Sequence, residues 1–206
     1  MTEYNYEFLQ SQNYQSINET EKVKLPTKYG NFALKVFHAD DGDHVVLIKG
    51  EVHGKKNVIV RLHSECFTGD IFSSCRCDCG QQLRKSMEFI EKAGEGIILY
   101  MRQEGRGIGL VDKIKAYALQ ENGFDTVEAN RKLGFAADLR SYKTGAKILK
   151  QLGLSSIRLL TNNPGKIAGL RAEGLKISER IPLIVEPNEN NKFYLFTKKQ
   201  KLRHLI

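Results

Sequence analysis

Apolar positions along the chain alternate or run together in short segments that predict β-strands. Residues 31–37 and 44–50 show this pattern and flank Asp40-Asp41-Gly42-Asp43, a turn-rich spacer typical of an antiparallel hairpin. A third strand, over 57–63, leads directly to Cys66, the first cysteine of the chain. Further strands are predicted over 96–101, 156–160, 177–185 and 192–197, and Thr126 is also expected on a strand.

Helical spacing of apolar residues appears between these strands. In 81–93, Leu83, Met87 and Ile90 recur on one helical face, and Gly94 is the expected end of the helix. Hairpin strands followed by alternating helices and strands predict an α/β fold with a mixed β-sheet and helices packed on its faces. The other predicted helices span 110–122, 141–152 and 164–172, the last beginning with proline, as first turns allow.

The sequence predicts one domain preceded by a flexible leader. Residues 1–22 are rich in Gln, Asn, Ser and Glu without any period, whereas 23–206 carry the predicted elements with no linker rich in proline or serine. A chain of 206 residues is long enough to bury a core. No segment approaches the roughly 20 apolar residues of a membrane span, and the N-terminus does not resemble an export signal. We therefore expect a cytoplasmic protein without a membrane partner.

A formal net charge of +8 indicates attraction to polyanions, and the distribution of the charge separates the candidates. The basic segment 198–204 is typical of a solvated helix face or tail. A zinc-dependent nucleic-acid binder would need aromatic residues interleaved with this tail, and none follows Phe196, so no nucleic-acid partner is expected. Basic residues in the Gly-rich turns 103–107 and 162–166 are more informative, because backbone amides and a cation can meet there on one phosphate.

All four cysteines lie between Cys66 and Cys79, which favours metal binding over disulfides in a chain without an export signal. Zinc is the leading candidate, although the spacing lacks the paired Cys-x2-Cys motifs of a zinc ribbon. Cys75, Cys77 and Cys79 alternate, so an extended backbone would place them on one face. Two interpretations stay open. The site is either a closed structural site of four thiolates, or a catalytic site in which Cys66, Cys77 and Cys79 bind zinc beside one water and Cys75 is a bystander.

Several motifs stand together in the order and at the spacing of one enzyme family. The first joins Arg61-Leu62-His63-Ser64-Glu65-Cys66-Phe67-Thr68-Gly69-Asp70 to Arg76-Cys77-Asp78-Cys79-Gly80, and the second is Arg102-Gln103-Glu104-Gly105-Arg106-Gly107-Ile108-Gly109-Leu110. Later motifs are Asp125-Thr126-Val127-Glu128-Ala129-Asn130, Leu133-Gly134-Phe135 with Asp138 and Arg140, and Leu160-Thr161-Asn162-Asn163-Pro164-Gly165-Lys166. In these blocks, between roughly residues 23 and 200, the chain closely resembles GTP cyclohydrolase II.

The resemblance implies the opening step of riboflavin biosynthesis. In this step a hydrolase converts GTP to 2,5-diamino-6-ribosylamino-4(3H)-pyrimidinone 5′-phosphate and releases formate and pyrophosphate. The resemblance further implies a homodimer, one zinc ion per chain held by Cys66, Cys77 and Cys79, and magnesium on the triphosphate. Opening the imidazole ring requires water to attack C8 of guanine, and a metal can lower the pKa of bound water from about 15.7 to about 7.

The resemblance also assigns substrate-binding and catalytic residues. Asp138 and Arg140 match a proposed proton acceptor and nucleophile, and Tyr117 matches a position linked to the completion of formamide hydrolysis. Because a guanidinium stays protonated in proteins, Arg140 is better suited to neutralising charge at the α-phosphate, with Asp138 orienting it or taking a proton. Gln82 and Glu104 are the candidates for guanine recognition. The positions that match GTP contacts are Arg61, Leu62, His63, Ser64, Glu65, Gln82, Glu104, Gly105, Arg106, Thr126, Thr161 and Lys166.

A second interpretation is a catalytically silent relative that binds zinc or nucleotide and regulates a partner. Loss of a zinc-binding cysteine, of Asp138 or of Arg140 would indicate such a protein. All of these residues are present, so the sequence favours an active GTP cyclohydrolase. Release of formate and pyrophosphate from GTP distinguishes the two interpretations.

Overall fold

The computed structural model describes residues 17–205 and contains one mixed β-sheet of eight strands. The strands are β1 Asn18–Glu19, β2 Val23–Thr27, β3 Gly30–Ala39, β4 Gly42–Lys49, β5 Val58–Ser64, β6 Gly96–Met101, β7 Ile157–Leu160 and β8 Ile177–Ile181. Their order is β1-β3-β4-β6-β5-β7-β8, with β2 paired to β3. The pairs β3/β4 and β4/β6 are antiparallel, whereas β6/β5, β5/β7 and β7/β8 are parallel. The predicted mixed sheet is therefore confirmed.

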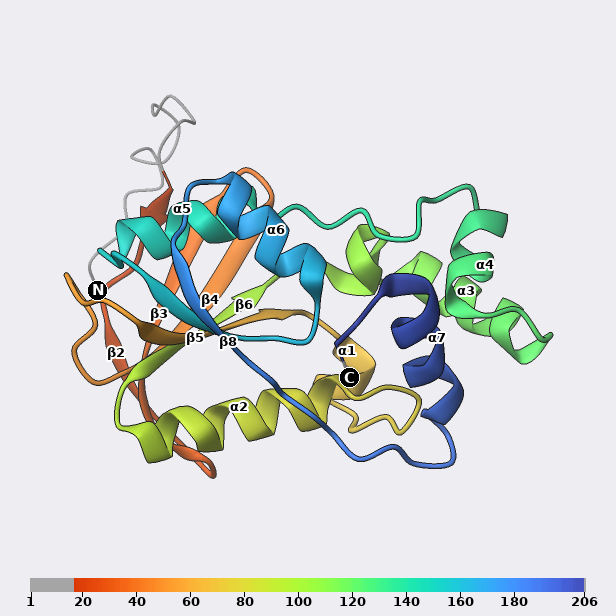
Figure 1. The fold of residues 1–206 in the computed structure, drawn as a ribbon, viewed down its shortest axis with the longest axis horizontal. Helices are drawn as coiled ribbons and strands as arrows, with labels where there is room; N and C mark the ends of the chain where they lie inside the picture. Colours follow the sequence, from red (N-terminus) through yellow and green to blue (C-terminus); the bar gives the residue numbers. More distant parts are fainter. Residues whose placement is uncertain (1–16, 206) are drawn as a thin grey trace, which may run out of the picture.

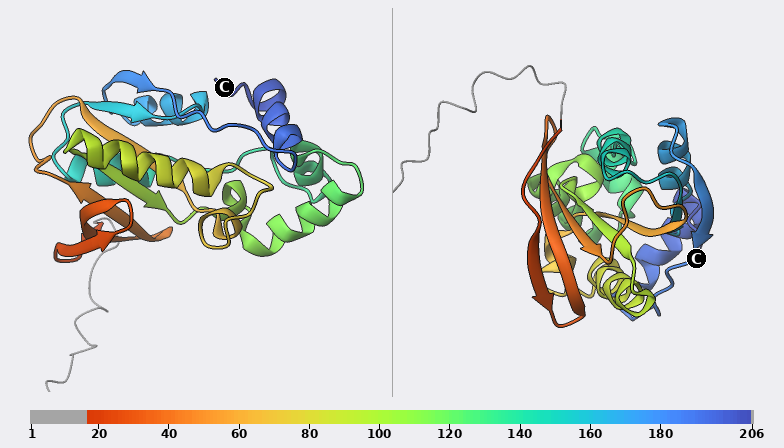
Figure 2. Two further views of the ribbon diagram at one scale, coloured as in Figure 1. Left: turned by 90° about the horizontal axis from the view of Figure 1, so that it is seen from below. Right: turned by 90° about the vertical axis from the view of Figure 1, so that its left-hand side faces the viewer.

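Helices cover both faces of this sheet, as the sequence predicts. They are α1 Phe67–Asp70, α2 Cys79–Ala93, the 3-10 helix η2 Glu104–Gly107, α3 Gly109–Glu121, α4 Thr126–Lys132, α5 Lys143–Gln151, α6 Pro164–Ala172 and α7 Lys192–Leu202. Helices α5 and α6 lie on one face of the sheet and α2 lies on the other (Figures 1 and 2). Ile148 and Leu149 of α5 belong to one apolar layer, and Met87 and Ile90 of α2 belong to the second.

Strand β5 is buried along its length and contributes to both layers. Val60 and Leu62 pack in the layer under α5 and α6, and Ile59 packs in the layer with α2. A parallel strand covered on both faces is expected to be apolar throughout. Arg61 and His63 depart from this expectation, because they are 5% and 1% exposed near the carboxyl end of the strand. Buried polar residues at such a strand end indicate a functional site.

The carboxyl ends of β5, β6 and β7 meet at one edge of the sheet because these strands run parallel. Helices α1, α3, α4 and α7 gather at this end of the molecule (Figure 1). Strand β5 leads to Cys66, β6 leads to the Gly-rich turn at 103–107, and β7 leads to the turn at 162–166. Open α/β sheets bind ligands outside the carboxyl ends of their parallel strands. The topology therefore brings together the three motif-bearing connections.

Several predicted elements agree closely with the structure. The strand over 96–101 and the helix over 164–172 have the predicted bounds, and β3 and β4 form the expected hairpin. Most of the expected leader lies outside the described residues, but Asn18–Glu19 forms β1 and pairs with β3. Strand β8 ends at Ile181, four residues before the predicted end at 185.

Three local predictions are wrong. Residues 192–197 are helical and form the first part of α7, because the buried residues Asn191, Leu195 and Lys198 repeat at helical spacing across this segment. Thr126 is the first residue of α4, where Asp125 and Glu128 form a reciprocal capping box. Cys75, Cys77 and Cys79 do not share an extended strand, because the chain turns there and Cys79 begins α2.

The longest helix within residues 17–205 is α2, which has 15 residues. None of the helices in this part of the chain combines the length and the apolar character that a membrane span requires.

Candidate active site

The three connections that follow β5, β6 and β7 line one pocket. Cys66 follows β5, Arg106 lies in the turn after β6, and Lys166 lies on α6 after β7. Helices α3, α4 and α7 complete the wall. The lining side chains include seven that are basic against two glutamates, so the pocket is strongly positive. The basic residues are Arg61, Arg76, Arg106, Lys113, Arg140, Lys166 and Lys198.

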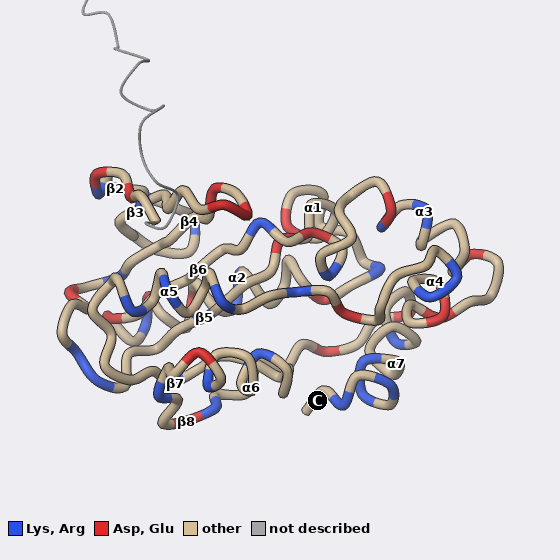
Figure 3. The backbone as a smooth tube through the Cα atoms, turned by 90° about the horizontal axis from the view of Figure 1, so that it is seen from above, with Lys and Arg blue, Asp and Glu red and all other residues tan. Residues whose placement is uncertain are grey.

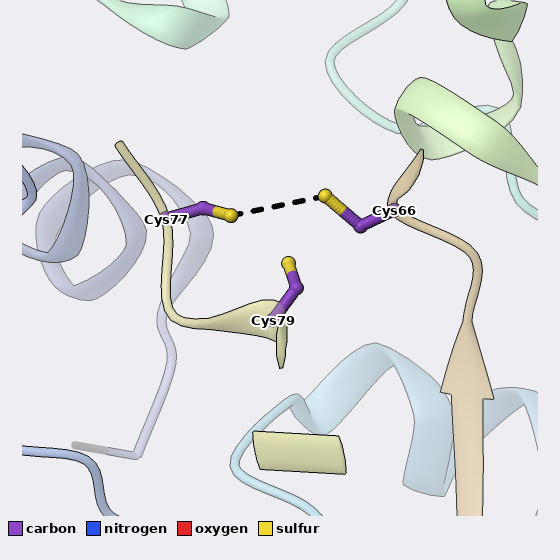
Figure 4. Close-up of side chains that lie close together, drawn as sticks. All are labelled: Cys66, Cys77 and Cys79. Atoms are coloured by element: carbon purple, nitrogen blue, oxygen red, sulfur yellow. Dashed lines mark hydrogen bonds between the residues drawn. The ribbon is translucent and has the colours of Figure 1, made fainter. Parts of the chain in front are cut away.

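Three of the four cysteines converge in this pocket, as Figure 4 shows. The side chains of Cys66, Cys77 and Cys79 point toward one another, and their sulfur atoms all lie within 4.8 Å of one another. The Sγ atoms of Cys66 and Cys77 are 3.7 Å apart, far too distant for a disulfide. Two thiolates on a tetrahedral zinc ion, with Zn–S bonds of about 2.3 Å, would be about 3.8 Å apart. The soft donors and their spacing therefore fit zinc.

Cys75 lies apart from this cluster. Its side chain is exposed, and it is not among the cysteines that converge. Cys66 and Cys77, by contrast, are buried, and Cys79 is half-buried. The structure thus brings together three thiols and leaves the fourth outside. This arrangement favours the interpretation with three protein ligands over a closed site of four.

The cluster depends on close packing of α1 against the start of α2. A Cβ atom on Gly69 would lie 2.9 Å from the Cys77 sulfur and 3.2 Å from the Cys66 sulfur. A Cβ atom on Gly80 would lie 2.1 Å from the carbonyl oxygen of Gly69. Any larger side chain at either glycine would collide with its neighbours. The two glycines therefore make room for the sulfurs and for whatever ion they hold.

The three thiols influence one another's acidity. Hydrogen bonds from Cys77 and Cys79 lower the pKa of Cys66. Donation to Cys66 raises the pKa of Cys77 to about 12, and the pKa of Cys79 is also raised. Without a cation, Cys77 and Cys79 therefore favour their protonated forms. A divalent metal ion would have to displace these protons, as is usual for cysteine ligands.

A buried network fixes the backbone at Cys66. The carboxylate of Asp70 accepts a hydrogen bond from the Cys66 amide at 3.0 Å and from the Tyr100 hydroxyl at 2.9 Å. The same carboxylate lies 3.1 Å from Nε2 of His63, whose ring stacks on Tyr100. Burial lowers the pKa of His63, so its imidazole is neutral. Asp70 thus holds the first cysteine in place, a role that sequence reasoning did not assign.

Glu104 and Lys113 form a second support behind Cys66. Glu104 accepts hydrogen bonds from the Phe67 amide at 2.6 Å and from Lys113 Nζ at 2.9 Å. Lys113 Nζ also donates to the Cys66 sulfur at 3.2 Å and to Thr68 Oγ1 at 3.0 Å. A buried ammonium beside a thiolate stabilises its negative charge. Lys113 was not predicted as a site residue. It lies four residues before Tyr117, so the predicted helix already places both residues on the same face.

The Gly-rich turn directs Arg106 into the pocket. Arg106 has φ +61°, an unusual left-handed conformation for a residue with a side chain, and Gly105 beside it has φ +62°. Both terminal nitrogens of the Arg106 guanidinium are buried, and neither has a hydrogen-bond partner among residues 17–205. A buried unpaired guanidinium is costly. An anionic ligand in the pocket would supply the missing acceptors.

Asp138 and Arg140 form a bidentate ion pair. Arg140 Nε lies 2.8 Å from Asp138 Oδ1, and Arg140 NH2 lies 2.5 Å from Asp138 Oδ2. Although burial acts in the opposite direction, this pairing lowers the pKa of Asp138 and raises the pKa of Arg140. Arg140 NH1 also approaches the Ser64 hydroxyl at 3.4 Å. Arg140 is therefore a fixed cation at the pocket wall.

Two further cations are tied to the sheet. Arg61 donates to the Leu160 carbonyl at 3.1 Å and to Gln82 Oε1 at 2.7 Å, and burial lowers its pKa to about 10, so it stays charged. Lys166 Nζ donates to the Leu62 carbonyl at 2.8 Å, and burial lowers its pKa well below the usual range. The N-terminus of α6 is capped by Asn163. An anion near Lys166 would favour its charged form.

Most of the site residues expected from the sequence line this pocket. Leu62 does not, because its side chain is fully buried in the apolar layer under α5 and α6. Asp138 lies behind Arg140 rather than on the wall. Tyr117 lines the wall beneath the Arg76 guanidinium, 4.4 Å from its ring centroid. Lining residues that were not predicted include Arg76, Lys113, Asn130, Tyr194, Lys198 and His204.

Comparisons with known proteins agree with the motifs. The sequence model of GTP cyclohydrolase II matches residues 18–182. Proteins named riboflavin biosynthesis protein RibBA are 57% identical over 90% of this chain in Bacillus mycoides and 53% identical over 92% in Endomicrobium trichonymphae. The match covers 47% and 48% of those proteins, so this chain spans about half the length of the curated relatives it matches.

A solved structure also resembles the chain, but the similarity is too low to support a conclusion about the fold. It is the crystal structure of RibBX, described as a two-domain 3,4-dihydroxy-2-butanone 4-phosphate synthase from A. baumannii, with a TM-score of 0.42 and 20% identity. The match covers 81% of this chain and 41% of that one. The family match, in contrast, extends over most of the sequence and includes all three converging cysteines. The chain belongs to the GTP cyclohydrolase II family.

Proposed function

We propose that this protein is a zinc-dependent GTP cyclohydrolase II in riboflavin biosynthesis. It would convert GTP to the diaminopyrimidine ribosylamine 5′-phosphate and release formate and pyrophosphate. The observation that carries the proposal is the unpaired, buried guanidinium of Arg106 in the same pocket as the three-thiol cluster. The guanidinium suits a polyanion, and the thiol cluster suits a metal that activates water. A nucleoside triphosphate whose base is hydrolysed needs both.

Cys66, Cys77 and Cys79 would hold the zinc ion, whose chemistry when bound is to activate water for attack on guanine C8 and then on the formamide. Glu104 and Lys113 keep Cys66 in place from behind. The Tyr117 hydroxyl lies 3.5 Å from Thr68 Oγ1, so the Tyr117 side chain reaches from α3 to the segment that follows Cys66. In this position Tyr117 can orient the opened ring for the second hydrolysis.

The basic walls would bind the triphosphate. Arg106 and Arg140 present guanidinium groups that match phosphate oxygens, and Lys166 adds charge at the capped start of α6. Magnesium would neutralise the remaining phosphate charge. Because Asp138 holds Arg140 in a bidentate pair, we assign Arg140 to charge neutralisation at the α-phosphate rather than to covalent attack.

Gln82 and Glu104 are the residues that we propose for guanine recognition. Both already bond to the protein. Gln82 bonds to Arg61 and Asp78, and Glu104 accepts from the Phe67 and Gly105 amides and from Lys113. A carboxylate has about four acceptor positions, so Glu104 can still accept a guanine N–H. The remaining contacts that we propose for the nucleotide come from His63, Ser64, Glu65, Gly105, Thr126 and Thr161.

We further propose that the enzyme is a cytoplasmic homodimer. A reducing compartment keeps the three thiols available for a metal. Helix α3 leaves Val111 69% exposed and Ile114 48% exposed, which is unfavourable in water and suits contact with a second copy of the chain. Sedimentation analysis of the protein and of Val111→Lys tests the dimer. A wild-type monomer at micromolar concentration would contradict it.

Incubation of the purified protein with GTP, zinc and magnesium tests the proposed reaction. We expect equal amounts of formate and pyrophosphate, and loss of formate in Cys66→Ser, Cys77→Ser and Cys79→Ser. Cys75→Ser is the matched control, because Cys75 is exposed and outside the cluster. Pyrophosphate without formate would indicate a defective metal site. Release of neither product by the metal-loaded wild-type protein would favour a silent, nucleotide-binding relative.

A further inference from the structure

The C-terminal segment after residue 182 lies beyond the matched family region, yet it lines the pocket. Tyr194 and Lys198 of α7, together with His204, are part of the wall. Helix α7 packs against α4, at the end of the sheet where the site lies (Figure 1), and Figure 3 shows basic residues along this helix. A segment that merely trailed from the domain would not reach the site.

Lys198 binds the loop that carries two of the three converging cysteines. Its Nζ donates to both carboxylate oxygens of Asp78, at 2.8 and 3.1 Å. Asp78 lies between Cys77 and Cys79, and both side chains are buried, with 9% of Lys198 and 3% of Asp78 exposed. Neither charge is stable in this position without the other. Docking of α7 and the conformation of the cysteine loop are thus coupled.

Tyr194 covers the guanidinium of Arg106. The centroid of the Tyr194 ring lies 5.8 Å from Arg106 Cζ and 5.0 Å from Lys198 Nζ. The terminal nitrogens of Arg106 are buried and have no partner within the part of the chain that the structure describes. The aromatic face stabilises both cations without supplying hydrogen-bond acceptors. Arg106 therefore stays available for a ligand while α7 keeps water away from it.

The end of the chain is attached at two more points. The Leu205 amide donates to the Asn162 carbonyl at 2.9 Å, which joins the C-terminus to the turn after β7. Lys201 pairs with Asp125 and, at 2.9 Å, with Glu128 on α4. Between these attachments lies His204, which lines the pocket together with Lys198, Arg140 and Arg106, and Asp78 is also close enough to influence its charge. An imidazole among three cations is well placed to donate to an anion that they bind.

We propose that residues 192–205 form a wall of the nucleotide site, in which Tyr194 and His204 bind the triphosphate and Lys198 positions the cysteine loop through Asp78. This proposal rests on the proposed function, because it takes the ligand to be a nucleoside triphosphate. His204 and Tyr194 are binding residues in this arrangement. Lys198 is a positioning residue, since its ammonium is already occupied by Asp78.

Binding of guanosine 5′-[α,β-methylene]triphosphate, which cannot release pyrophosphate, tests the first part. We expect His204→Gln and Tyr194→Leu to weaken binding roughly 10- to 100-fold without change in zinc content. Lys199→Met is the control, because Lys199 is an exposed neighbour on α7. Unchanged affinity in both variants, or tighter binding after removal of residues 188–206, would contradict the wall. Tighter binding after the removal would show that α7 obstructs the site and does not bind the ligand.

Zinc affinity, measured by competition with a chelator, tests the second part. Lys198→Met leaves the Asp78 carboxylate buried and unpaired, so we expect affinity to fall at least tenfold relative to Lys199→Met. The double variant Asp78→Asn/Lys198→Met removes both charges, and affinity should recover. Equal zinc affinity in wild type, Lys198→Met and the double variant would overturn the positioning role.

The same measurements separate this proposal from the proposed function. If the wild-type protein binds the analogue and releases formate from GTP, and the variants behave like wild type, only the proposal of a C-terminal wall is contradicted. Wild-type protein that neither binds the analogue nor releases formate would contradict the proposed function and the wall with it.

Discussion

Lys113 Nζ lies 3.2 Å from the sulfur of Cys66 and, among the described residues, is the one cation that donates a hydrogen bond to the three-thiol cluster. The same ammonium pairs with Glu104 and bonds to Thr68, so it is held in this position from three sides. Hydrogen bonds from outside the ligand set orient metal ligands and tune their basicity. Lys113 therefore belongs to the metal site although it cannot bind the metal itself.

Lys113→Met should lower zinc affinity roughly 10- to 100-fold, because the substitution removes a donor to the thiolate and leaves Glu104 without its cation. Chelator competition measures the change. Lys115→Met on the same helix is the control, since Lys115 is exposed and pairs only with Asp112 among the residues described. A similar loss in both variants would show that the effect comes from general charge and not from the contact with Cys66.

Gly69→Ala should disturb the metal site without unfolding the domain. Gly69 lies in α1 with ordinary helical backbone, so alanine adds no strain from φ, but its Cβ would press against the sulfurs of Cys77 and Cys66. Overpacking of this kind costs about 1–3 kcal/mol. We expect reduced zinc per chain by elemental analysis and an unchanged far-ultraviolet circular dichroism spectrum. Full zinc occupancy with wild-type affinity would mean that α1 moves aside at little cost.

Arg140→Lys should slow pyrophosphate release roughly 100-fold. A lysine ammonium cannot form the bidentate pair with Asp138 and also offer two coplanar N–H donors to a phosphate. Zinc content should not change, since Arg140 contacts Ser64 and Asp138 rather than a cysteine. Asp138→Asn should give a smaller loss, because Arg140 remains in place. Quenched-flow measurement of pyrophosphate distinguishes these outcomes, and a faster Arg140→Lys enzyme would exclude the assigned role.

Docking of the C-terminal segment should weaken at acidic pH. Burial, followed by the charges of Lys198, Arg140 and Arg106, lowers the pKa of His204 to about 3. A released His204 would titrate near 6.5, so below that pH the released form binds a proton and the docked form does not. Docking is therefore strongest above about pH 6.5 and declines toward pH 3, by up to roughly tenfold per pH unit.

Amide exchange in residues 192–205 measures this change, after correction for the intrinsic pH dependence of exchange. Protection should fall between pH 7.5 and 5.5 in wild type and change less in His204→Gln, which has no titratable ring. Asp78, which is also close enough to influence the charge of His204, is paired with Lys198 and holds a lowered pKa, so it stays ionised over this range. An identical loss of protection in His204→Gln would assign the effect to another group.

Regular elements with strong local signals could be predicted from the sequence. The apolar run over 96–101 is bounded by glycine and polar residues, and Pro164 fixes the start of α6, so both have the predicted bounds. The spacing of the cysteines left a site of three thiolates and a site of four open, and the resemblance to the family favoured Cys66, Cys77 and Cys79. Their geometry could not be predicted, because it depends on the turn before α2 and on the space left by Gly69.

Helix α7 shows why the rest could not be predicted. Its buried positions include Thr197 and Lys198, which a hydropathy pattern places outside, while Phe193 is 61% exposed and Phe196 is 58% exposed. The consecutive apolar residues over 193–196 instead indicated a strand over 192–197. The helix is set by a partner far away in the sequence, since Lys198 is buried only because Asp78 neutralises it. Tertiary pairing of this kind leaves no local signal.

The two apolar layers on the sheet have a consequence for assembly of the enzyme. Within residues 17–205 neither layer includes a cysteine, so the hydrophobic contacts that hold β5, α2 and α5 together do not depend on an ion. Small zinc domains whose folding energy comes from the metal are unfolded without it. Here the chain can acquire its architecture without an ion, so the protein is expected to stay folded in the presence of a chelator and to accept a metal ion afterwards.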